Sequence, residues 1–178
     1  MESVMERYVT AARELGATWA RAVPAHYVVT APWVRFKCRF GCSGYDAGWL
    51  CPPRTPTPAE TAAVVKCYDR ALLAAWEAPP GEKPRRAARG RMHKAILELE
   101  RRIFLDGHPK ALGFAAGPCN LCEECDVATP CRRPGEPRPA MEACGIDVFT
   151  TMANAGFKLE VRRCEEDGHY QCGLVLVD

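Results

Sequence analysis

No run of apolar residues in this sequence is long enough to cross a bilayer, which takes roughly 20 consecutive apolar positions in a helix. The start of the chain lacks the basic and apolar segments of a secretory signal and carries Glu2, Glu6 and Glu14 instead. An excess of one charge is also missing, because 24 basic and 22 acidic residues leave a net charge of only +2. General affinity for nucleic acid is therefore not implied. We predict a cytoplasmic protein that binds neither membranes nor nucleic acid.

Several common functional sites are also missing from the sequence. No glycine-rich phosphate loop follows a predicted strand, and no order of serine, histidine and aspartate indicates a hydrolase. The histidines lack the short spacing of metal ligands, so we interpret each of them as a surface residue or a satisfied core residue. They are His26, His93, His108 and His169.

Cysteine, in contrast, is abundant, with 11 residues in a chain of 178. In a secreted protein this number would suggest disulfides. The odd count, the clustered spacing and the missing signal favour reduced thiols that bind metal. Most of these thiols fall into two groups, one early and one late in the chain.

The late group consists of Cys119, Cys122, Cys125 and Cys131. Its first three thiols recur at every third position, as in bacterial ferredoxins, where closely spaced thiolates surround a 4Fe-4S cluster. In those ferredoxins a proline directly follows the fourth cysteine, whereas Arg132 follows Cys131 here, so the spacing indicates the first three ligands more directly. Zinc is the alternative, since four thiolates also make a closed tetrahedral site. Zinc ribbons, however, usually divide their ligands into two separated Cys-x-x-Cys pairs.

The early group consists of Cys38, Cys42 and Cys51, in a segment that we expect to be an aromatic and glycine-rich loop. Three thiols are one short of a full set for a second 4Fe-4S cluster. Either a distant residue completes the set, with Cys144 and Cys67 as candidates, or one iron stays open. A third possibility is that these cysteines are merely small buried hydrophobic residues.

The fourth ligand separates two classes of function. A cluster with four cysteine ligands can only pass electrons, to a redox partner protein, whereas an open iron can bind a small-molecule ligand as a Lewis acid. In the second case the protein would be an enzyme. A third class is a zinc-stabilised interaction module. In the enzyme, four polar side chains could orient a small acidic substrate, namely Arg39, Tyr45, Asp46 and Arg138.

Periodicity and turn signals predict an α+β fold: a mostly antiparallel sheet with flanking helices and cysteine-rich metal-binding loops. We expect one domain over residues 1–178, with an early cysteine loop at 38–53 and a ferredoxin-like loop at 117–144. The expected helices are 3–15, 58–68, 91–105 and 141–155; the expected strands are 27–30, 71–77 and 111–116; a hairpin is expected from 157–164 and 170–177.

Three further expectations concern side chains within these elements. Cys144 falls in the first turns of the helix expected at 141–155, whose N-terminal field would lower the pKa of the thiol. Cys164 and Cys172 fall in the hairpin and are assigned a structural role. The basic stretch 78–90 is expected to be an exposed connection or the start of the next helix.

Three segments together resemble a known family. They are Cys38-Arg-Phe-Gly-Cys42, Trp49-Leu-Cys51-Pro52-Pro53 and the stretch 117–148, with its late cysteine group and an Arg-Pro-Ala-Met-Glu-Ala segment. The sequence is similar to the predicted metal-binding family called domain of unknown function 2284. In that family an aromatic residue usually stands two positions after the last cysteine of the late group, where Arg133 stands here.

The resemblance implies a prokaryotic, cytoplasmic protein that binds metal. It implies no mechanism. The metal ligands that it implies are Cys38, Cys42, Cys51, Cys119, Cys122, Cys125 and Cys131, with Cys144 as a further candidate.

Overall fold

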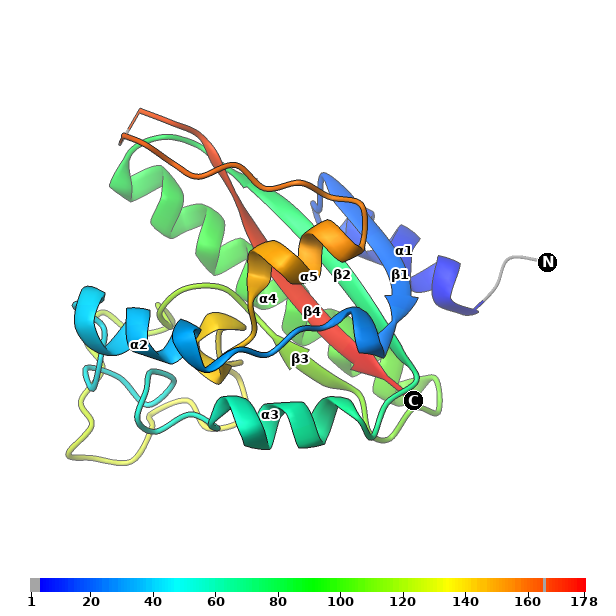
Figure 1. Ribbon diagram of the computed structural model, residues 1–178, viewed down its shortest axis with the longest axis horizontal. Coiled ribbons are helices and arrows are strands. Elements are labelled where there is room, and N and C mark those ends of the chain that lie inside the picture. The colour runs from blue at the N-terminus through cyan, green and yellow to red at the C-terminus, as the bar shows by residue number, and fades with distance from the viewer. Residues whose placement is uncertain (1–3, 165) are drawn as a thin grey trace.

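A four-stranded antiparallel sheet forms the centre of the protein (Figure 1). Our computed structural model describes residues 4–164 and 166–178. The strand order is β1-β2-β4-β3, so the last strand of the chain lies inside the sheet. The strands are β1 (Trp19–Pro24), β2 (Arg70–Ala78), β3 (Leu112–Phe114) and β4 (His169–Val177).

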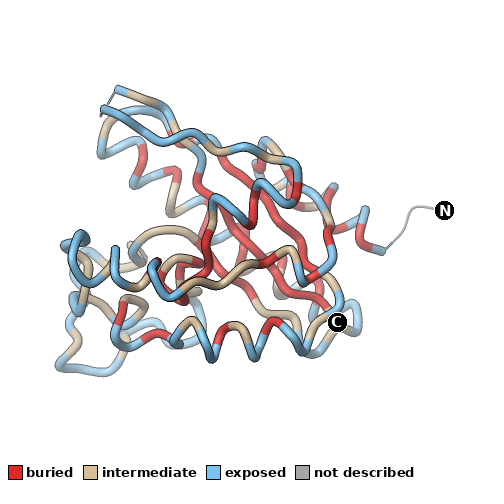
Figure 2. Tube along the Cα trace, in the orientation of Figure 1, coloured by how far each residue is buried: buried red, intermediate tan, exposed pale blue. Residues whose placement is uncertain are grey.

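The two central strands, β2 and β4, pair over their full lengths, from Arg70 opposite Val177 to Ala78 opposite His169. Each is covered on both faces, which explains why both read as nearly continuous apolar runs. Successive side chains point to opposite faces of a strand, so each apolar run supplies two cores. Figure 2 shows the buried residues gathered along these strands.

One face of the sheet is covered by α1 (Val4–Glu14) and α4 (Glu82–Leu105). Their apolar stripes, including Tyr8 on α1 and Ile96 and Leu99 on α4, pack against Leu72 and Val175 of the central strands.

The opposite face is covered by shorter elements. Met141, Ile146 and Met152 pack there against Leu73 and Leu174. The elements on this side are the 3₁₀ turns η1 (Ala25–Tyr27) and η2 (Glu142–Cys144) and the helices α2 (Pro32–Gly41), α3 (Pro58–Val65) and α5 (Val148–Asn154).

The α+β class, the antiparallel sheet and most of the expected elements are confirmed. Helix α1 lies within the expected 3–15, of which residue 3 is outside the described residues. Thr57 caps α3 as predicted, in a reciprocal capping box with Glu60. Strands β2, β3 and β4 occupy the expected segments, and Leu174 to Val177 are fully buried. The basic residues of the stretch 78–90 belong to α4, which begins at Glu82, while β2 ends at Ala78.

Three expectations are wrong. The predicted strand 27–30 is replaced by η1 and an isolated bridge at Thr30, while the strand in this region is β1. The predicted helix 141–155 is divided into η2 and α5, because Gly145 takes a left-handed conformation with φ of 79° and Asp147 starts a new helix as its N-cap. The first arm of the predicted hairpin, 157–164, forms no strand.

None of the helices within the described residues has the length and apolar character that a bilayer crossing requires.

Candidate metal centre

The two cysteine segments, 80 residues apart in the chain, lie side by side beyond the C-terminal end of α2 (Figure 1). Trp49 of the early segment ties them together. Its indole Nε1 donates to the backbone oxygens of Asp126, at 3.3 Å, and Thr129, at 3.0 Å, which are both in the late segment. The fold thus brings the two groups to one place.

All four thiols of the late group line a single cavity of about 710 Å³. Trp49 and Leu50 of the early segment form part of its wall. We call this space the late-group cavity. Glu124 and Asp126 also line it, but the four thiols are its soft donors, and soft thiolates select zinc, copper(I) or iron-sulfur clusters over hard cations. The ferredoxin-like loop stays a prediction from the cysteine spacing.

The early group begins on a helix, and the prediction of a loop throughout is wrong here. Cys38 lies in the last turn of α2, Cys42 is the residue that ends this helix, and Cys51 follows in the loop. The backbone N–H of Gly44 points to the Cys42 sulfur at 3.4 Å. Hydrogen bonds of this kind to cluster and ligand sulfurs are among the features that tune iron-sulfur sites.

Two glycines leave the space beside these thiols open. A Cβ on Gly44 would lie 3.5 Å from the Cys42 sulfur and 3.7 Å from that of Cys51. A Cβ on Gly48 would lie 3.9 Å from the Cys51 sulfur and 3.7 Å from that of Cys125. Cys51 therefore lies between the rest of its own group and the late group.

Burial raises the pKa of the Cys38, Cys51 and Cys119 thiols above the ordinary value. For Cys51 the neighbouring thiols Cys42, Cys38, Cys125 and Cys119 raise the pKa further, in that order. A metal must displace these protons, because only the thiolate is a ligand. Within residues 4–164 and 166–178, no three or more His, Cys, Asp and Glu side chains form a group that could hold a metal ion as they stand.

Arg35 of α2 anchors the early segment to the rest of the protein. Its Nη1 donates to the Ala143 backbone oxygen at 2.5 Å, the Thr55 Oγ1 at 2.8 Å and the Pro56 oxygen at 3.1 Å. Thr55 Oγ1 also donates to the Ala143 oxygen, at 2.6 Å. One guanidinium thus connects α2, the end of the early cysteine loop and η2.

Replacing Arg35 by methionine should lower the free energy of unfolding by about 2 kcal/mol, because several hydrogen bonds to a charged donor are lost. The early group should also lose metal more readily to a chelator. Arg39→Met is the matched control, since Arg39 lies on the same helix, exposed and over the Phe40 ring. Urea denaturation and metal release would be measured for both, and equal behaviour would contradict the anchoring role.

The other cysteines lie apart from this centre or inside the core. Cys144 is 0% exposed, and burial raises the pKa of its thiol to about 12, so the predicted lowering by a helix N-terminus is wrong. Its place is a 3₁₀ turn and not a helix start. Cys172 is buried in the same core, whereas Cys67 and Cys164 are exposed.

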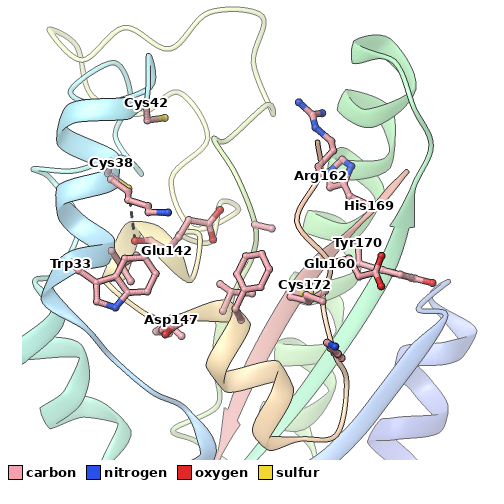
Figure 3. Close-up of a pocket in the computed structure, with 18 of the residues that line it drawn as sticks. Trp33, Cys38, Cys42, Glu142, Asp147, Glu160, Arg162, His169, Tyr170 and Cys172 are labelled. Carbon is pink, nitrogen blue, oxygen red and sulfur yellow. Dashed lines mark hydrogen bonds between the residues drawn. The ribbon is translucent and has the colours of Figure 1, made fainter. Parts of the chain in front are cut away.

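A second cavity, of about 740 Å³, lies between α2 and the segments 158–162 and 168–172. We call it the α2–β4 cavity. Cys38 and Cys42 lie on one side of it, Arg162 and His169 on the other, and the Glu142 side chain projects between them (Figure 3). The Glu142 carboxylate accepts the Gly117 N–H at 3.0 Å, and burial raises the pKa of this carboxyl.

Sequence reasoning missed Glu142, Arg162 and His169. None of the three stands at a short, motif-like spacing from Cys38. The family resemblance includes Glu142, in the Met-Glu-Ala segment, but assigns it no role. The side chains predicted to orient a substrate stand elsewhere: Arg138 makes a two-bond ion pair with Glu100, with both distances 2.6 Å. Among the described residues, the lining of the α2–β4 cavity includes none of the four predicted ones, Arg39, Tyr45, Asp46 and Arg138.

Comparison with known proteins supports metal binding. A family described as a predicted metal-binding protein, domain of unknown function 2284, matches residues 21–177, which include all 11 cysteines. No curated protein and no solved structure matches the chain. The chain therefore belongs to the family of predicted metal-binding proteins called domain of unknown function 2284.

Proposed function

We propose that the two cysteine groups hold iron-sulfur clusters and that the protein is a redox or electron-transfer protein. The observation that carries this proposal is the late-group cavity, which is lined by all four thiols of a ferredoxin-like spacing. A cluster held by four thiolates would supply electron transfer. Cys119, Cys122, Cys125 and Cys131 are the proposed ligands there.

Cys38, Cys42 and Cys51 are the proposed ligands of a second cluster. The position of Cys51 next to Cys125 would place the two centres close together, which suits transfer of electrons between them and on to a partner protein. Cys144 is left out of this set, because its thiol is fully buried among apolar side chains.

The α2–β4 cavity favours a second candidate function, an enzyme. Cys38 and Cys42 line this cavity, so a metal that they bind would border a space large enough for a small molecule. In this alternative the early group leaves one metal position free for that molecule. A zinc-stabilised interaction module is the third reading of the same thiols.

Reduction of the protein under anaerobic conditions tests the redox proposal. We expect a reversible electron-spin signal and a reduction potential within the range of iron-sulfur proteins, which spans about −700 to +450 mV. A change of the signal when small molecules are added would favour the enzyme. A protein that contains metal but accepts no electrons would contradict the redox proposal.

A further inference from the structure

The α2–β4 cavity has the size and the walls of a small-molecule site. Its volume of about 740 Å³ lies within the range of about 300 to 1,000 Å³ that is usual for ligand pockets. Side chains of Trp33, Ile146, Phe149 and Leu159 contribute to its lining. Trp33 is 47% exposed and Phe149 also 47%, which is high for large hydrophobic residues. An apolar ligand body would cover these rings.

One side of the cavity is positively charged. Arg162 and His169 lie next to each other there, opposite Cys38 and Cys42 (Figure 3). Burial lowers the pKa of His169, and the nearby charges of Arg162, Arg85 and Arg89 lower this pKa further. Three guanidinium groups thus act on the same place, and an anionic group would be attracted there.

One ring nitrogen of His169, Nδ1, is buried without a hydrogen-bond partner among the described residues. A buried polar atom without a partner costs free energy, and a ligand oxygen could supply the missing bond.

The acidic side chains of the lining do not cancel this charge. Asp147 is engaged in capping α5, where it accepts from the Thr150 backbone N–H at 3.1 Å and from its hydroxyl at 2.6 Å. Glu142 accepts from Gly117, as described above, and Glu160 is exposed to solvent. Arg162 and His169 therefore remain available to an anion, as do Lys37 and Lys158, which also line the cavity.

We propose that the α2–β4 cavity binds a small organic acid that has an apolar or aromatic body. The carboxylate lies at Arg162 and His169, and the body lies against Trp33 and Phe149. The far end of the molecule faces Cys38 and Cys42. Only this last point rests on the proposed function, since it places the ligand beside a metal held by those thiols.

Calorimetric titration of the metal-loaded protein with 3-phenylpropionate tests the proposal. We expect binding at one site per chain, and binding at least about tenfold weaker for 3-phenylpropionamide, which lacks the charge. Arg162→Gln should weaken binding of the acid by about tenfold or more. Arg163→Gln is the matched control, because Arg163 is the next residue in the chain and lies outside the lining.

A second pair of variants tests the apolar wall. Trp33→Ala should weaken binding, whereas Phe36→Ala should not, since Phe36 is 64% exposed on the same helix and lies outside the lining. The proposal is overturned if the acid fails to bind at about 1 mM, if the amide binds equally well, or if Arg162→Gln and Arg163→Gln behave alike.

Metal analysis of the same samples separates this inference from the proposed function. Charge-dependent binding to a protein that contains zinc without iron would support the cavity and contradict the clusters. Iron and sulfide in a protein that fails to bind the acid would contradict the cavity and support the clusters. A shift of the electron-spin signal on adding the acid would support the placement of the ligand beside Cys38 and Cys42.

Discussion

Replacement of Cys122 by serine is expected to remove about half of the iron bound to the protein, from about eight irons per chain to about four. Cys122 is a central member of the late group and lines its cavity together with the other three thiols. A hydroxyl is a harder and poorer ligand than a thiolate for iron in such a cluster. The early group keeps all its thiols in this variant, so its metal should remain.

Cys67→Ser is the matched control for this replacement. Cys67 is exposed, whereas Cys122 is half-buried. The Cys67 sulfur is 3.5 Å from the backbone oxygen of Ala63 in α3, away from both cysteine groups. Its replacement should leave the iron content unchanged. Equal iron content in Cys122→Ser and the parent protein would contradict the assignment of the late group, and loss of iron from Cys67→Ser would make Cys67 a ligand.

Substitution of Gly145 by alanine should lower the free energy of unfolding by about 3 kcal/mol. This is a large effect, because the free energy of unfolding of a typical domain is only about 5 to 15 kcal/mol. Gly145 has a φ of 79°, which L side chains rarely adopt. An added Cβ would also collide with Pro58, whose Cβ would be 2.7 Å and whose Cα would be 3.0 Å away. The backbone therefore cannot accept the methyl group without moving α3 or η2.

The same substitution should disturb the early cysteine group. The Gly145 oxygen accepts the Ala31 N–H at 2.8 Å, immediately before the start of α2, so this turn helps to position the helix that carries Cys38.

Gly135→Ala separates backbone strain from the collision. Gly135 has a similar φ of 85°, but an added Cβ would meet no atom within 4 Å. This control should therefore cost only about 1 kcal/mol. Urea denaturation of both variants measures the difference, and equal losses of stability would contradict the packing of Gly145 against Pro58.

The sequence predicts the scaffold well where one physical signal dominates. Long apolar runs mark β2 and β4, and the Thr57-Pro58 start with Glu60 marks α3. It fails where the signal is short or mixed. Strand β1 has six residues with an irregular burial pattern, and it contains polar Arg21 and ends at Pro24.

Helix α2 was missed for a different reason. Its only buried residue is Val34, and its large side chains Trp33, Phe36 and Phe40 are exposed. Trp33, Phe36 and Phe40 recur at spacings of three and four residues, which is a helical pattern, so the helix was detectable from the sequence. The glycines and closely spaced cysteines that follow favoured a loop instead.

Local spacing reveals the cysteine groups but not their surroundings. Thiols that recur within a few residues can be recognised in one dimension. The Cys38 sulfur lies 3.9 Å from the Glu142 backbone oxygen, across a separation of 104 residues. Contacts of this kind form the α2–β4 cavity, and only the three-dimensional fold brings their partners together.

The most direct test of this account is the amount of iron, acid-labile sulfide and zinc per chain in protein purified without oxygen. Two clusters predict about eight irons and about eight sulfides, with little zinc. About four of each would leave the late group as the cluster site and contradict the second cluster. Zinc without sulfide would contradict the redox proposal as a whole and identify the thiols as a structural metal site.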